Sequence, residues 1–215
     1  MHKQEWSDLM GTNKARIDKS IKKILEGKTI DEAKLSMTEI TSTMKSNFIG
    51  KEVSEEAYQS IVGVVGGKLS KFYALEEDEY EEIASDLLKR EQWVNEVMEL
   101  VEDNLDIEMS EILLKALRIA LAETIKEEKD ERYFIEKLLY QIVFLSLENT
   151  MQGALESLDD GLTIPQIRKE FIEPLSDRLF EDDVRENISK LMEGKVNLAI
   201  VNEQIANKLK KFGGF

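Results

Sequence analysis

One segment of the chain is apolar around most of its circumference when it is drawn as a helix. It runs from Asp130 to Leu158 and contains far more large apolar residues than one buried helix face requires. They are Phe134, Ile135, Leu138, Leu139, Ile142, Val143, Leu145 and Leu147. A helix of this kind has to be surrounded by other helices. We therefore predict that this segment is the central helix of a bundle.

The rest of the sequence also has helical periodicity, and no stretch of useful length alternates as a strand would. Two capping boxes, Thr29–Glu32 and Thr163–Gln166, mark helix starts, while Pro174 should kink or divide the helix that contains it. The other expected helices cover approximately residues 13–26, 33–44, 54–72, 77–103, 107–128, 183–192 and 196–211, with a turn at 159–161. The predicted fold is an all-α bundle of about seven to nine helices.

Charge is distributed unevenly along the chain. Residues 1–51 hold ten Lys and Arg against seven Asp and Glu, whereas residues 76–106 hold two against thirteen. The sign changes near Phe72–Glu77. We therefore predict a mildly basic helical segment over residues 1–73 and an acidic helical bundle over residues 74–215, with one continuous domain as the alternative.

The whole chain has a formal charge of −15, which disfavours binding to nucleic-acid phosphates. It contains no cysteine, so thiolate metal sites and a cysteine nucleophile are excluded. Its single histidine, His2, lies at the terminus, which argues against histidine-based acid–base catalysis and histidine metal sites. We expect no cofactor.

The first residues, Met1–Asn13, contain charged side chains and no apolar run long enough for a signal peptide. The longest strongly apolar stretch, Leu138–Leu147, is about half the length that a membrane-spanning helix needs. The sequence therefore predicts a cytoplasmic protein without a membrane span.

Clustered carboxylates raise the alternative of a metal-dependent, all-α nucleotide hydrolase. Glu127, Glu128 and Glu131 match one half of the magnesium-binding pattern of such enzymes, and Glu156 with Asp159 matches the other. If one helix joins Glu131 to Glu156, however, the two halves lie roughly 37 Å apart at 1.5 Å rise per residue. A single ion cannot span that distance, because its ligands lie about 2 Å from it.

Glycines are concentrated in the Val62–Lys68 stretch, which fails as a phosphate-binding loop because Val62 and Leu69 replace required residues. On a helix, the small residues of this region share one face opposite the apolar one: Ser60, Gly63, Gly66, Gly67 and Ser70. One interpretation is that a second helix, from this chain or another, packs closely on this face. The other is that the glycines end one helix and Lys68 begins the next.

Two further features have both a structural and a functional interpretation. An acidic run is typical of a solvated helix start, where the helix dipole favours acids, but it could also dock a basic partner. Its acids are Glu76, Glu77, Asp78, Glu79, Glu81 and Glu82. At the C-terminus, Phe212 and Phe215 could contact a partner, although Phe212 also continues the apolar face of the last predicted helix.

Because no catalytic constellation is recognisable, we expect a non-enzymatic protein-interaction or regulatory module that forms oligomers. Its partner would be another protein or a second copy of the chain. Besides the metal-dependent hydrolase, the remaining alternative is a DNA-binding regulator that uses the three N-terminal helices. The long connection at residues 46–53 and the few base-reading side chains argue against it.

Overall fold

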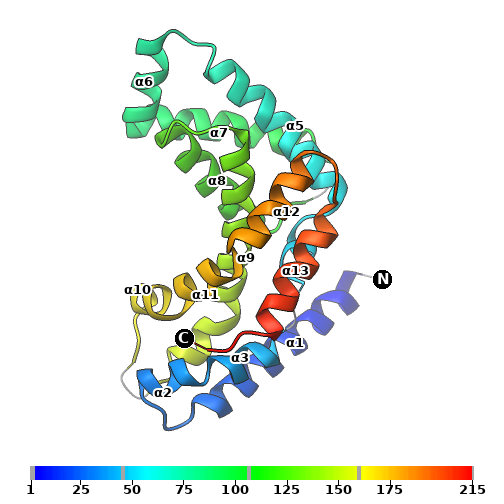
Figure 1. The fold of residues 1–215 in the computed structure, drawn as a ribbon, viewed down its shortest axis with the longest axis vertical. Helices are drawn as coiled ribbons and strands as arrows, with labels where there is room; N and C mark the ends of the chain where they lie inside the picture. The colour runs from blue at the N-terminus through cyan, green and yellow to red at the C-terminus, as the bar shows by residue number, and fades with distance from the viewer. Residues whose placement is uncertain (1–2, 45–46, 106–107, 159–160, 215) are drawn as a thin grey trace. The chain divides into compact units, whose positions relative to one another are not determined.

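The computed structural model describes residues 3–44, 47–105, 108–158 and 161–214, with side chains from Lys14 onward (Figure 1). All regular secondary structure in these ranges is helical, which confirms the prediction of an all-α, multi-helix protein. No helix among the described residues is both long enough and apolar enough to cross a membrane. His2, Asp159, Asp160 and Phe215 lie outside the described residues.

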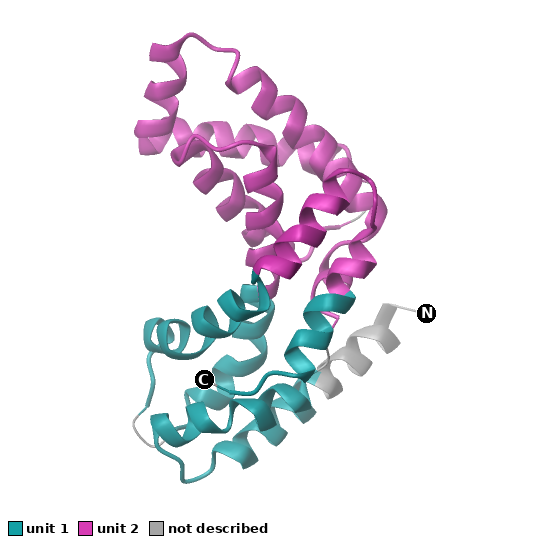
Figure 2. Cartoon of the chain, in the orientation of Figure 1, with its two compact units in different colours: residues 1–46, 144–181, 203–215 teal, residues 47–143, 182–202 magenta. Residues whose placement is uncertain are grey.

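The backbone forms two compact units, each assembled from separate stretches of the chain (Figure 2). Unit 1 contains residues 1–46, 144–181 and 203–215, and unit 2 contains residues 47–143 and 182–202. Each unit is therefore held together by contacts between segments that are distant in sequence. The predicted division at residue 73, which rests on charge, stays a prediction.

Unit 1 contains the C-terminal part of the long helix α9 together with several other helices. Helix α9 spans Glu131–Leu155, and only its last part belongs to this unit. The other elements are α1 (Lys3–Leu25), α2 (Ile30–Leu35), α3 (Met37–Thr43), α10 (Ile164–Ile167), a π-helix η1 (Arg168–Ile172), α11 (Glu173–Leu179) and the C-terminal part of α13 (Leu198–Lys210). Buried apolar residues such as Met37, Ile40, Phe171 and Leu175 form its core.

Unit 2 contains the helices α5 (Glu55–Phe72), α7 (Leu87–Asp103) and α8 (Glu111–Lys126). Its other elements are α4 (Ile49–Glu52), α6 (Glu77–Ser85), α12 (Asp182–Met192), the first part of α9 and the start of α13. Phe72 is buried at the end of α5 and packs edge-on against Tyr73, Tyr80 and Trp93, with ring centroids 5.1–6.1 Å apart. This aromatic cluster holds the C-terminal end of α5 against α6 and α7.

Two helices predicted to be continuous are interrupted. The expected helix over residues 77–103 breaks at Asp86, whose extended backbone lets its carboxylate accept from the amides of Leu88 and Lys89. The expected helix at 33–44 breaks at Ser36 into α2 and α3. Apolar periodicity alone does not reveal these breaks, because a serine or an aspartate can either cap a helix or remain inside one.

The glycine-rich segment, by contrast, lies within one uninterrupted helix. Helix α5 runs without interruption from Glu55 to Phe72, so the interpretation that the glycines end a helix is wrong. Neither Gly66 nor Gly67 has the positive φ of a helix C-cap, whereas Gly27, which follows α1, has a φ of +67°. Burial of apolar side chains on one face of α5 stabilises the helix despite its glycines. These side chains include Ala57, Ile61, Val65, Leu69 and Phe72.

Pro174 modifies its helix without ending it, as the local hydrogen bonds show. The amide of Glu173 donates to the carbonyl of Arg168, five residues back, and residues 168–172 form the π-helix η1. Proline has no amide to donate, and its ring disturbs the preceding turn of an α-helix. The wider turn lets the chain remain helical from α10 through α11, so the predicted division is a local change of helix type.

Helix α9 is continuous and almost entirely buried through its middle. Phe134, Leu138 and Ile142 are fully inaccessible to solvent, as is Leu147. The segment is shorter than the predicted 130–158 at both ends. Its place at the centre of the whole fold stays a prediction, since each unit is described by itself.

Candidate functional site

The small residues of α5 form an exposed face in unit 2. Gly63 and Gly67 are exposed, and a Cβ atom built on either would meet no other atom within 4 Å. Ser70 is exposed as well, and Ser60 is half-buried, with its hydroxyl 3.4 Å from the carbonyl oxygen of Asn104. We call Ser60, Gly63, Gly67 and Ser70 the glycine face.

Gly66 does not belong to this exposed face, although the sequence grouped it there. A Cβ atom at Gly66 would lie 3.0 Å from the carboxylate of Glu131, at the start of α9. Glycine at this position therefore allows close approach of an acidic side chain within unit 2. No comparable contact within the described residues accounts for Gly63 or Gly67.

Two exposed glycines in an 18-residue helix are unfavourable unless something compensates for them. Each costs about 0.5–1 kcal/mol relative to alanine in a helix interior. Their four-residue spacing places them on the same side of the helix, one turn apart. Such a surface is smooth enough for the backbone of another helix to approach closely.

The two ends of α5 carry opposite charges. Glu55 and Glu56 lie in its first turn and Lys71 in its last. The carboxylate of Glu55 already accepts the amide of Leu198 at 2.8 Å within unit 2, and Glu56 is exposed. Exposed charge of opposite sign therefore flanks the glycine face at its two ends.

The acidic run occupies the start of α6, as the structural interpretation expected. Glu77, Asp78 and Glu79 form the first turn, where the helix dipole stabilises acids. Glu82 pairs with Lys89, and the remaining acids are exposed. Burial, followed by the charges of Glu128, Glu77 and Glu81, raises the pKa of Tyr80 above its usual value. The role of this run as a docking surface stays a prediction.

The C-terminal segment packs onto unit 1. Phe212 is buried with only 6% of its surface exposed, and the Arg178 guanidinium lies 5.4 Å from the centre of its ring. Arg178 also donates to the carbonyl of Gly214. Phe212 therefore continues the buried face of α13. Its contact with a partner stays a prediction.

The described carboxylates do not gather as the nucleotide-hydrolase alternative requires. Because α9 is unbroken, its full length separates Glu131, its first residue, from Glu156, which directly follows its last residue. Within residues 3–44, 47–105, 108–158 and 161–214, no three acidic or histidine side chains form a potential metal site. The proposed N-terminal DNA-binding module is also divided, since α1–α3 belong to unit 1 and α5 to unit 2.

Two buried carboxylates have dedicated partners inside the units. Glu148 of α9 pairs with Arg168 of η1 through two nitrogens, one of them 3.1 Å from Oε2, and this bonding raises the pKa of the guanidinium. Glu52 accepts a 2.5 Å hydrogen bond from Ser110, the N-cap of α8. Both acids tie one helix to another and are therefore structural.

One feature was missed by the sequence interpretation: an open pocket in unit 1, between α2 and the α10–η1 run. Its walls are separated by more than one hundred residues in sequence, so no local motif could reveal it. The two capping boxes that begin α2 and α10 were recognised, but nothing in them showed that these helix starts lie side by side.

Comparison with protein-family models, with curated proteins and with solved structures finds no match to this chain. The geometry described above is therefore the basis for assigning a function.

Proposed function

We propose that this chain is a non-enzymatic, cytoplasmic protein-interaction module that self-associates through the glycine face of α5. One observation carries the proposal: Gly63 and Gly67 lie exposed in an unbroken helix, with open space beyond each. A helix packed on this face would compensate for the low helix propensity of both glycines. A regulatory role would follow from control of that association.

A second copy of α5 fits this face because its small residues are arranged symmetrically. Ser60 and Ser70 lie at equal distances in sequence from residue 65, and so do Gly63 and Gly67. In an antiparallel pair related by a two-fold axis, each serine would face a serine and each glycine a glycine. A two-fold interface requires this kind of self-complementarity.

The charges at the ends of α5 are complementary in the same arrangement. The antiparallel pair would bring Glu56 of one copy within one turn, about 4.5 Å along the axis, of Lys71 of the other. A parallel pair would instead place like charges together. Because one helix pair buries little surface compared with a standard protein interface, we expect a weak, reversible dimer.

Sedimentation velocity over a range of concentrations tests this proposal. The wild-type chain should show a monomer–dimer equilibrium, and Gly63→Leu or Gly67→Leu should shift it to monomer by obstructing close approach of the helices. Ala199→Leu is the matched control, since it adds a similar side chain at an exposed helical position of the same unit. A wild-type monomer at every concentration, or a dimer indifferent to both glycine variants, contradicts the proposal.

Charge reversal tests the antiparallel arrangement separately. Glu56→Lys and Lys71→Glu should each weaken the dimer, because each places like charges opposite one another. The double variant Glu56→Lys with Lys71→Glu should restore association, since it exchanges the two signs. Failure of the double variant to recover would contradict this arrangement even if the glycine variants behave as expected.

A further inference from the structure

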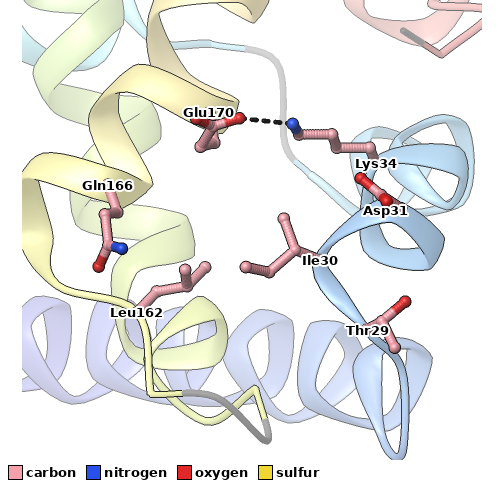
Figure 3. A pocket seen from close by; sticks show the side chains of 7 residues that line it. All are labelled: Thr29, Ile30, Asp31, Lys34, Leu162, Gln166 and Glu170. Carbon is pink, nitrogen blue, oxygen red and sulfur yellow. Dashed lines mark hydrogen bonds and ion pairs between the residues drawn. The ribbon is translucent and has the colours of Figure 1, made fainter.

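The pocket of unit 1 has a volume of about 420 Å³ and lies between two helix starts (Figure 3). One wall comes from α2 and the residue before it, and the other from the α10–η1 run and the residues before it. The residues that line it are Thr29, Ile30, Asp31, Lys34, Leu162, Gln166 and Glu170. Cavities that bind small molecules are of this size, about 300–1,000 Å³.

Apolar and charged groups occupy different parts of this pocket. Ile30 and Leu162 point toward each other from opposite walls, as Figure 3 shows. At one end, the Lys34 ammonium lies 2.5 Å from Oε2 of Glu170 and joins the two walls. Asp31 contributes a second carboxylate, so the pocket holds two acids and one base. Its net charge is therefore negative, as is that of the whole chain.

The helix starts beside the pocket are poorly suited to binding an anion. In α2, the Thr29 amide donates to the Glu32 carboxylate, and the Thr29 hydroxyl accepts the Glu32 amide. Beside α10, Gln166 accepts the Thr163 amide at 2.9 Å. These capping boxes satisfy amides that a bound anion would otherwise use, and the carboxylates of Asp31 and Glu170 would repel it.

The geometry points to a ligand of the opposite charge: we propose that this pocket binds a primary ammonium group carried on an unbranched aliphatic chain. The chain would pack between Ile30 and Leu162, as the methylene stem of a lysine packs against apolar surface. The ammonium would bind Glu170 in the place that Lys34 now occupies, and the negative charge of Asp31 in the same pocket would favour it. The negative charge of the protein raises the local concentration of such a cation.

This chemistry has two sources: a free alkylamine or the side chain of a lysine in another polypeptide. Titrating the full chain with n-butylamine, and separately with lysine blocked at its amino and carboxyl groups, distinguishes them. Methyl resonances of Ile30 and Leu162, followed by NMR, report binding at the pocket itself. Binding of either probe supports the proposal, and the tighter one identifies the source. If neither probe shifts these resonances, the proposal is wrong.

Ligands of matched length test the role of charge. n-Butanol keeps the aliphatic chain without the ammonium, and n-butyrate reverses the charge. Both should bind at least about fivefold more weakly than n-butylamine, because they lack the ionic contact with the carboxylates. Equal binding of n-butanol would mean that only the apolar walls matter, and tighter binding of n-butyrate would mean that the helix starts bind anions. Either outcome overturns the proposal.

Variants of the charged residues provide the decisive comparison. Glu170→Gln and Asp31→Asn should each weaken n-butylamine binding about fivefold, whereas Glu39→Gln, an exposed acid of the same unit outside the pocket, should not. Lys34→Met should strengthen binding about twofold to fivefold, because the ligand no longer competes with an internal ammonium for Glu170. Equal affinities in Glu170→Gln and the wild type would refute the site.

Circular dichroism of each variant checks that unit 1 remains folded. If Lys34→Met does not fold, the n-butylamine affinities of Glu170→Gln and Glu39→Gln still test the proposed site. The pocket is in unit 1 and the glycine face in unit 2, so this experiment and the sedimentation experiment can fail independently.

Discussion

Neighbouring glycines in α5 serve different purposes, which is clear only from what surrounds each one. Gly66 gives room to the Glu131 carboxylate, whereas Gly63 and Gly67 face open space. All three adopt helical backbone angles, so none is required by a positive φ. Gly63 and Gly67 therefore make α5 of the monomer less stable than alanines at the same two positions would.

Substitution with alanine measures that loss. Gly67→Ala should raise the free energy of unfolding of the monomer by about 0.5–1 kcal/mol, because alanine has the higher helix propensity and its Cβ meets nothing. Gly66→Ala should gain less, because its Cβ would press on Glu131 at 3.0 Å. Urea unfolding at concentrations where the chain is monomeric provides the measurement. A larger gain at position 66 than at 67 would contradict the assignment of these roles.

At the scale of elements, the start of α8 is coupled to α4 through a single hydroxyl. Ser110 accepts the amide of Leu113 at 3.1 Å and donates to the Glu52 carboxylate at 2.5 Å. The Glu52 side chain is only 4% exposed, and its other oxygen lies 3.3 Å from Lys51 Nζ without making a hydrogen bond. Ser110 therefore caps one helix and satisfies a buried acid of another.

A comparison of two caps separates these contributions. Ser54→Ala removes only the cap of α5 and should cost about 1 kcal/mol of unfolding free energy. Ser110→Ala removes a similar cap and also leaves the buried Glu52 carboxylate without its hydroxyl donor, so it should cost about 2–3 kcal/mol. Chemical denaturation of both variants is the measurement. Equal losses would show that the Glu52 contact contributes nothing.

For the whole molecule, carboxylates in both units make stability sensitive to acid. The pKa values of four acids lie below their usual range. Hydrogen bonds from backbone amides are the main cause for two of them: the Thr29 amide lowers the pKa of Glu32, and the Lys89 amide lowers that of Asp86. Hydrogen bonds from lysine side chains are the main cause for the other two: Lys34 lowers the pKa of Glu170, and Lys195 lowers that of Glu193. Glu32 and Glu170 belong to unit 1, and Asp86 and Glu193 belong to unit 2. Because the folded state favours their charged forms, their stabilisation is complete above the unfolded pKa and disappears as pH falls through the folded pKa.

We therefore expect the urea midpoint to fall steeply below about pH 4 at constant ionic strength, in both units. Between neutral pH and the isoelectric point near 4.7, decreasing repulsion among the excess acids should keep it level or raise it slightly. Tryptophan fluorescence of a Trp6→Phe variant reports on unit 2 through Trp93, and circular dichroism reports on both units. A midpoint at about pH 3 equal to that at neutral pH would contradict this expectation.

Much of the local structure could be predicted because its causes are local. The capping boxes at Thr29 and Thr163 and the presence of a helix irregularity near Pro174, though not its type, depend on residues within a few positions of each other. The breaks at Ser36 and Asp86 were missed, since a serine or aspartate can cap a helix or remain inside it. Which one occurs depends on how the flanking helices pack.

The sequence by itself determined that this chain forms an all-α protein, because apolar residues at helical spacing leave it no other way to bury its surface. For the glycine-rich segment it left two interpretations open, one helical face or the end of a helix, and the structure decided between them. Only the tertiary structure decided that Gly63 and Gly67 are uncovered while Gly66 receives Glu131, and that α2 and η1 meet around a pocket. The physical reason is distance along the chain: periodicity and caps act within a few residues, whereas these contacts join segments that only folding brings together.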